Sequence, residues 1–248
     1  MMLAKSTPLA NRGFTLVEMA MVLMIVGILL GGLFVPLSAQ MEQRKVTETQ
    51  KSLEEIREAL TGYAVINGQL PCPADPTLAS SAANAGVPRT GTPPCTAGNS
   101  TGVIPWVTLG VNETDAWGNR FTYRVDPDYA DAVGTTFDCT PTTTPSQSSF
   151  ALCTTGTYTV LSAATGGTNV ALNIPAVVIS HGKNGAGSYT QSGALIPASS
   201  NADEIENSDG NADSNYVSHS QTTGYDDMLV WVSNNVLLNR AVMAGKLP

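Results

Sequence analysis

Residues 13–37 read GFTLVEMAMVLMIVGILLGGLFVPL, and no other part of the chain constrains the structure as strongly. Between residues 19 and 37 no side chain is charged or strongly polar. About 20 apolar residues are enough for a helix to cross the hydrocarbon core of a membrane. We therefore expect residues 14–37 to form an apolar membrane-spanning helix. Glu18 needs a separate reason, because a carboxylate just inside an apolar span is costly and is usually functional.

Charged residues are unevenly distributed along the chain. Residues 1–13 carry Lys5 and Arg12 and no acidic side chain, whereas the whole chain has 20 acidic and 12 basic residues. Basic residues that precede an apolar span remain in the cytoplasm. Residues 1–13 are therefore predicted to be a cytoplasmic leader, with the bulk of the chain across the membrane. The net charge of −8 and the charged fraction of 13% argue against a nucleic-acid partner.

Residues 38–68 are predicted to continue the helix as an amphipathic stalk. One stripe recurs at helical spacing: Val46, Thr49, Leu53, Ile56, Leu60 and Tyr63. Asn67, Gly68 and Pro71 then predict the end of the helix. A stripe on one face requires a surface to pack on. A dimeric coiled coil is the weaker alternative, because the three heptads include a threonine at a core position.

Residues 69–248 are predicted to form a β-rich globular head. Short runs rich in β-branched and aromatic residues lie at 103–109, 119–125, 157–163, 176–180 and 228–233. A final short helix is expected at residues 235–244. A sheet packed on the amphipathic half of the helix gives an α+β fold, with a long N-terminal helix packed on an antiparallel β-sheet head.

All four cysteines lie in the head, at Cys72, Cys95, Cys139 and Cys153. Beyond the membrane, disulfides form and persist. Four cysteines allow three pairings. We favour Cys72–Cys95 and Cys139–Cys153, because each closes a loop of Pro, Thr, Ser and Gly that buries little surface. Each bridge would contribute about 3 kcal/mol.

An acidic loop at residues 209–215 places oxygen-bearing side chains at every second position, the spacing that calcium loops use. It is not an EF-hand, because Ser214 and Ser220 replace the glycine and the glutamate of that motif. Other acidic residues could complete a different cage: Asp203, Glu204, Glu206, Asp226 and Asp227. The candidate calcium ligands are Asp209, Asn211, Asp213, Asp226 and Asp227. A solvated acidic loop without metal is the alternative.

No catalytic constellation is evident, so an enzyme is not predicted. The Gly-x-Ser-x-Gly pattern at residues 98–102 lacks the preceding strand and following helix of a hydrolase elbow. The two histidines, His181 and His219, lie in a turn and a loop without the context of a triad or a metal trio. A phosphate loop or dinucleotide fingerprint is absent from the sequence.

The segment GFTLVE at residues 13–18, with its basic leader and apolar run, resembles the class III signal of type IV pilins and type II secretion pseudopilins. The segment DAWGN at residues 115–119, followed by Tyr123, is similar to the Asp-x-Trp-Gly segment of major pseudopilins. The resemblance implies the type IV pilin fold, cleavage by a prepilin peptidase between Gly13 and Phe14, and N-methylation of Phe14. It also implies that Glu18 pairs with the N-terminal ammonium of a neighbouring subunit.

By the same resemblance, the function would be that of a structural subunit assembled into a type IV pilus or a type II secretion pseudopilus. Its partners would be other subunits, the prepilin peptidase, the inner-membrane assembly platform and the lipid bilayer. It would cross the inner membrane once with its head in the periplasm, and would later join a cell-surface or periplasmic filament. Major pseudopilins bind calcium in a C-terminal loop, which favours the same ion here. The alternative is a membrane-anchored periplasmic ligand-binding or adhesion domain, in which Glu18 would have no use.

Overall fold

The computed structural model describes residues 13–89, 95, 100–137, 139, 142–208 and 214–247, and only the backbone of residues 30–37. The chain forms two compact units, Met1–Arg44 and Lys45–Pro248. Helix α1, Leu16–Asn67, contributes to both units. Gly68 follows it with a φ of 75°, a left-handed conformation that ends helices and that glycine adopts without strain. The helix end predicted at Asn67 and Gly68 is confirmed.

Within the unit Met1–Arg44, the described side chains of α1 are mostly apolar and exposed. Phe14 is 81% exposed and Leu16 is 86% exposed. Among the described residues, no helix is both long enough and apolar enough to cross a membrane. The span predicted at residues 14–37 is thus not confirmed, and it includes residues 30–37, whose side chains fall outside the description.

Within the unit Lys45–Pro248, a four-stranded antiparallel sheet forms the centre of the head. Its strand order is β1 (Thr101–Val103), β2 (Thr122–Val125), β5 (Ala176–Ser180) and β7 (Met228–Val232). This order puts β7 at one edge of the sheet. The long helix α1 is thus followed by a head with an antiparallel sheet, which confirms the predicted α+β class.

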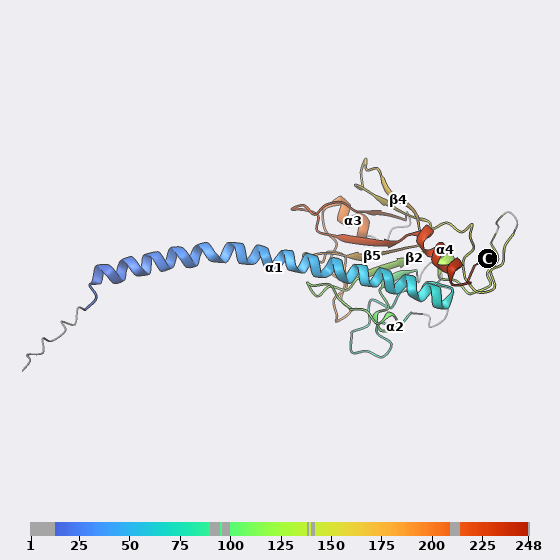
Figure 1. Ribbon diagram of the computed structural model, residues 1–248, viewed down its shortest axis with the longest axis horizontal. Coiled ribbons are helices and arrows are strands. Elements are labelled where there is room, and N and C mark those ends of the chain that lie inside the picture. The colour runs from blue at the N-terminus through green and yellow to red at the C-terminus, as the bar shows by residue number, and fades with distance from the viewer. Residues whose placement is uncertain are drawn as a thin grey trace, which may run out of the picture. The chain divides into compact units, whose positions relative to one another are not determined.

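The apolar stripe of α1 packs on one face of this sheet (Figure 1). Leu53, Ile56 and Leu60 are at most 1% exposed and join a core that includes Tyr123 and Val178. Each such buried apolar side chain contributes about 1.5–3 kcal/mol. Helix α4, Asn234–Met243, borders the same core through its buried residues. The stalk predicted from the stripe therefore has the sheet that it requires.

A smaller sheet covers the opposite face of the large one. Its order is β4 (Asn169–Ile174), β3 (Tyr158–Leu161) and β6 (Asn215–Val217), with β3 and β4 antiparallel and β3 and β6 parallel. Side chains of a strand alternate between the two faces of its sheet. Val177 and Ile179 of β5 accordingly enter a second core between the sheets.

The structure corrects the expected strand at residues 103–109. Strand β1 ends at Val103, and α2, Trp106–Leu109, follows Pro105. Proline has no amide hydrogen for a sheet ladder and fixes a φ that suits a helix start. Other elements were also not predicted: β4, β6, α3 (Ala202–Ser208) and a short 3-10 helix, Pro127–Tyr129. Strand β4 is largely exposed and β6 has three residues, so neither gives a clear alternating pattern.

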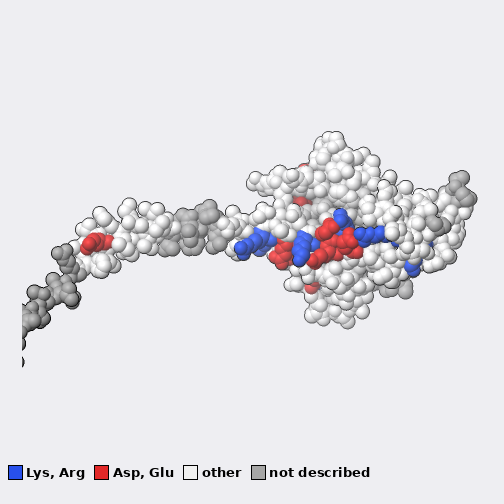
Figure 2. All heavy atoms as spheres, in the orientation of Figure 1, with Lys and Arg blue, Asp and Glu red and all other residues white. Residues whose placement is uncertain are grey.

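Charged side chains gather along α1 on the face that Figure 2 shows, while the rest of the head on that face is almost free of them. The ion pairs on this surface include Lys51 with Glu55 at 3.6 Å and Arg57 with Glu54. These groups are well exposed, so the pairs keep the helix soluble and add little stability.

Candidate functional sites

The first candidate site is the start of α1. Thr15 immediately precedes the helix, and its backbone amide and hydroxyl donate hydrogen bonds to Oε2 of Glu18, at 2.9 and 2.8 Å. In return, the amide of Glu18 donates to the hydroxyl of Thr15 at 3.2 Å. This reciprocal arrangement is a capping box. The sequence did not lead us to predict this capping box, although a threonine three positions before a glutamate is its signature. Among the described residues, Oε1 of Glu18 has no hydrogen-bond partner.

The residues expected to be processed adjoin this capping box. Gly13 and Phe14 are both exposed and lie before the first residue of α1. Of the predicted leader, only Gly13 lies within the described residues. Cleavage after Gly13 would leave Thr15 and Glu18 on the same chain, so the capping box is compatible with processing.

Two disulfides join loops in the head. Cys72 pairs with Cys95, and Cys139 pairs with Cys153, with Cα atoms 5.6 and 6.0 Å apart. These are the pairings that the sequence favoured. Cys72 and Cys95 are buried in the main core, so their bridge ties the chain after α1 to the interior of the head.

Residues 115–120 form a turn that organises the head. Asp115 accepts hydrogen bonds from the amides of Trp117 and Asn119, both at 2.9 Å, and from the hydroxyl of Ser180 at 2.7 Å. Burial raises the pKa of Asp115, against the opposing effect of these hydrogen bonds. The turn leads into Arg120, which is fully buried. The Asp-x-Trp-Gly segment therefore has a structural role here.

Three carboxylates from distant parts of the sequence form a cluster in the head. Glu204 of α3, Asp226 and Asp227 offer oxygens that all lie within 4.8 Å of one another. Glu204 is 1% exposed and Asp227 is 2% exposed. Carboxylate oxygens at this spacing are ligands for a hard divalent cation such as Ca²⁺.

Backbone and amide groups hold these carboxylates in place. The side-chain amide of Asn184 donates to both oxygens of Glu204, at 3.0 and 3.1 Å, and its backbone amide donates to Oδ2 of Asp226 at 2.9 Å. Asn207 donates to Oδ2 of Asp227 at 2.8 Å. Among the described residues, the buried Oδ1 atoms of Asp226 and Asp227 lack a hydrogen-bond partner. The donor set thus fits a cation that would satisfy these two oxygens.

Burial disfavours the charged form of this cluster. It raises the pKa of Asp226 to about 6, and the neighbouring carboxylates of Glu204 and Asp227 add to the effect. The ring of His181 lies beside the cluster: its Nδ1 is 3.6 Å from Oδ1 of Asp227, and its Nε2 is 2.9 Å from the hydroxyl of Thr122. His181 directly precedes the turn at residues 182–184, as expected, but its side chain is fully buried. Strand pairing between β2 and β5 brings it beside Thr122, which no local pattern indicates.

Only part of the predicted calcium set can be placed. Asp226 and Asp227 come together, whereas Asp209, Asn211 and Asp213 lie outside the described residues. Glu204, which the sequence analysis named among the acidic residues that could complete a cage, joins the cluster because α3 packs beside β6.

Comparison with known proteins gives one match. Residues 9–34 match the prokaryotic N-terminal methylation motif. This motif is the signature of the prepilin-type signal of type IV pilins and pseudopilins, which confirms the family resemblance at the N-terminus. The match covers none of the head. No curated protein and no solved structure matches the chain.

Proposed function

We propose that this chain is a pilin-like structural subunit, cleaved between Gly13 and Phe14 by a prepilin peptidase and N-methylated at Phe14. The processed subunit then assembles into a type IV pilus or a type II secretion pseudopilus. The methylation motif at residues 9–34 carries the proposal. The same motif favours a membrane-associated precursor with its head in the periplasm.

The exposed start of α1 supports assembly. Large apolar side chains exposed over contiguous residues mark a surface that binds lipid or protein. In the precursor, lipid would cover the residues from Phe14 to Ile28, and in a filament the helices of other subunits would replace it. The inner-membrane assembly platform would be the partner at which this exchange takes place.

Glu18 supplies a specific contact for that exchange. Thr15 holds one oxygen of the carboxylate and leaves the other, Oε1, available for a charged donor. Cleavage after Gly13 creates an ammonium at Phe14, and the ammonium of a neighbouring subunit can then pair with Oε1. In an apolar environment, pairing relieves the cost of an isolated carboxylate. Processing would therefore permit assembly.

The mass of the mature chain tests this proposal. We expect full-length chain co-expressed with a prepilin peptidase to be lighter by residues 1–13 and heavier by one methyl group. Without the peptidase the mass should be that of the precursor. A Gly13→Leu variant, which keeps the capping box, should also stay unprocessed. Cleavage at another position, or an uncleaved chain in the presence of the active peptidase, would refute the proposal.

A second function, calcium binding by the head, is favoured by the cluster of Glu204, Asp226 and Asp227. The two unpartnered carboxylate oxygens are the observation that supports it. Bound Ca²⁺ would lock α3 to the start of β7, because its ligands come from both segments. The loop with Asp209, Asn211 and Asp213 would add ligands from one further segment.

Thermal unfolding of the full-length chain with and without calcium tests this second function. We expect Ca²⁺ in excess to raise the unfolding temperature, because a ligand that binds only the folded state stabilises it. Asp226→Asn should abolish the increase. Glu55→Gln, an exposed change on α1, is the matched control and should retain it. If calcium did not change the unfolding temperature of the wild type, calcium binding would be refuted. The cluster would then be a network of carboxyl groups that share protons.

A further inference from the structure

Two cavities in the head lie next to one tryptophan. A cavity of about 160 Å³ lies between the end of β4 and the start of α4, and another of about 370 Å³ lies between β7, α1 and α4. Trp231 and Ser233 line both. Trp231 is the penultimate residue of β7, the edge strand of the large sheet, and it is only partly buried. An aromatic side chain that is not fully buried has surface left to contact a ligand.

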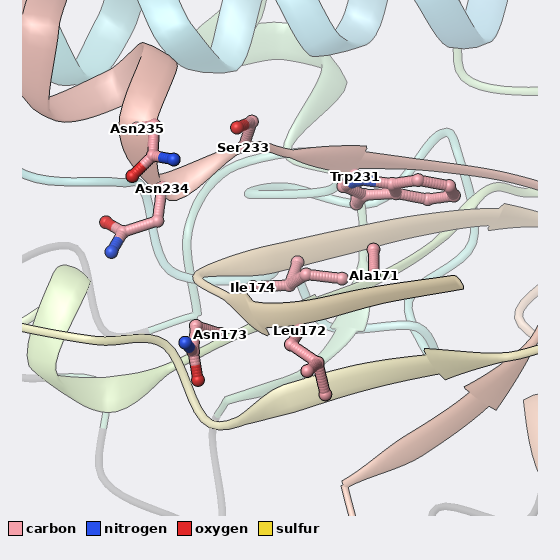
Figure 3. A pocket seen from close by; sticks show the side chains of 8 residues that line it. All are labelled: Ala171, Leu172, Asn173, Ile174, Trp231, Ser233, Asn234 and Asn235. Carbon is pink, nitrogen blue, oxygen red and sulfur yellow. The ribbon is translucent and has the colours of Figure 1, made fainter. Parts of the chain in front are cut away.

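The smaller cavity combines this indole with uncharged polar groups (Figure 3). Asn173 lies on the β4 side, while Ser233 and Asn235 lie on the α4 side. Among the described residues, these three side chains make no hydrogen bond. Ser233 occupies the position before α4, where a serine normally caps the helix, yet its hydroxyl makes no capping bond. Three polar side chains around the cavity are therefore available for a ligand.

Other residues at this cavity have structural roles and keep its shape. The side-chain oxygen of Asn234 accepts from the hydroxyl of Tyr129 at 2.7 Å, and its amide donates to the carbonyl of Thr154 at 3.2 Å. These bonds fix the start of α4. Asn173 has a φ of 57°, a conformation that asparagine tolerates better than most residues. The cavity is therefore supported by contacts that do not involve its free polar groups.

Charge at the larger cavity is already paired. Arg240 donates to both oxygens of Glu58, at 2.9 and 3.4 Å, and Arg57 pairs with Glu54. The smaller cavity has no titratable side chain. A charged ligand would find no unpaired charge of opposite sign. A neutral ligand rich in groups that both donate and accept hydrogen bonds fits better, since amides and hydroxyls do the same.

We propose that the cavities beside Trp231 bind a neutral saccharide. One face of a pyranose ring presents C–H groups that pack on an indole, and its hydroxyls can bond to the side chains of Asn173, Ser233 and Asn235. The bidentate pair of Arg240 and Glu58 would meet the next sugar unit in the larger cavity. This function is independent of processing at Gly13, and it would let an assembled head contact a glycan surface.

Titration of the full-length chain with sugars tests the proposal. The chain is kept in solution with lauryl dimethylamine oxide, a detergent whose head group is not a sugar. Cellotetraose, maltotetraose and N,N′,N″,N‴-tetraacetylchitotetraose are the probes, and calorimetry measures binding. We expect saturable binding of at least one tetrasaccharide. Trp231→Ala should weaken it by about tenfold, since tryptophans dominate binding sites of this kind.

Conservative variants separate binding from folding. Trp231 also packs in the core between the sheets, so its loss can affect stability. Asn173→Asp and Asn235→Asp remove an amide donor at nearly constant shape, and each should weaken binding about fivefold. Asn239→Asp, exposed on the same helix α4 and lining neither cavity, is the matched control and should leave binding unchanged.

Three outcomes would overturn the proposal. The first is that none of the three tetrasaccharides binds. The second is that one binds and the variants at Asn173 and Asn235 bind it as tightly as the control. The third is that a neutral hexapeptide of alternating threonine and valine binds in a Trp231-dependent manner while the sugars do not. That result would identify the edge of β7 as a strand-addition site instead.

Discussion

Replacing Arg120 by methionine should destabilise the head strongly. Arg120 is fully buried and lies 4.9 Å from the ring centroid of Trp106. Its guanidinium donates five hydrogen bonds between 2.8 and 3.2 Å. The acceptors are Oε1 of Glu113, the carbonyl oxygens of Pro76, Leu78 and Gln191, and the hydroxyl of Ser80. One side chain therefore joins the turn at residues 115–120 to two loops that are distant in sequence.

The cost follows from the acceptors that the variant leaves behind. Methionine fills most of the volume but donates nothing. The hydroxyl of Ser80 can still donate to Glu113 at 2.5 Å, and the backbone amide of Ser80 donates to the carbonyl of Gln191 at 2.9 Å, so these two acceptors keep a partner. The carbonyls of Pro76 and Leu78 have no other hydrogen bond among the described residues. Each unsatisfied buried carbonyl costs about 1–3 kcal/mol. With the loss of the buried ion pair, we expect Arg120→Met to lower the free energy of unfolding by about 3–5 kcal/mol in total.

Thermal unfolding followed by tryptophan fluorescence measures this cost. A loss of this size lowers the unfolding temperature of a chain of about this length by roughly 10 °C. Arg240→Met is the matched control, because Arg240 also forms a bidentate pair, but its side chain is 42% exposed. Its pair with Glu58 contributes about 0–1 kcal/mol. If Arg120→Met unfolded at the temperature of the control, the buried network would not hold the loops together, and the reasoning would fail.

Three further predictions concern the N-terminus, the disulfides and the acidic cluster. Glu18→Gln should leave processing intact and reduce filament incorporation, measured by crosslinking per processed subunit, whereas Leu23→Ala should have a much smaller effect. Equal incorporation of both variants would argue against the ammonium pairing. Joint replacement of Cys72 and Cys95 by serine should lower the free energy of unfolding by about 3 kcal/mol, measured by denaturant titration. Thiol alkylation of the unfolded, unreduced wild type should label no cysteine. The increase in unfolding temperature caused by calcium should shrink as the pH falls through about 6, because burial raises the pKa of Asp226 to about that value. Without calcium the sign reverses: the protonated form of Asp226 is favoured in the folded state, so its contribution to stability is lost as the pH rises through about 6. An undiminished effect of calcium at about pH 5 would exclude Asp226 as a ligand.

Local patterns predicted those parts of the chain in which neighbouring residues decide the structure. The stripe from Val46 to Tyr63 has helical spacing, so it indicated both the stalk and the face that packs on the sheet. Strand 176–180 was predicted at its observed bounds, because a short apolar run between turn residues is typical of a buried strand. Strand β4 gave no such signal, since most of its side chains face solvent.

The sequence by itself therefore determined the long helix, the α+β class and the methylation motif that ends in the apolar run after Glu18. Each depends on residues within a few turns of one another, and spacing along the chain records such relations. Tertiary structure alone decided the cluster of Glu204, Asp226 and Asp227, the burial of His181 beside Thr122, and the cavities beside Trp231. These sites join segments that are distant in sequence, and the pairing of β2 with β5 and the packing of α3 and α4 bring them together. A linear pattern carries no information on such distances, because they are fixed only when the sheets and helices bury their apolar faces against one another.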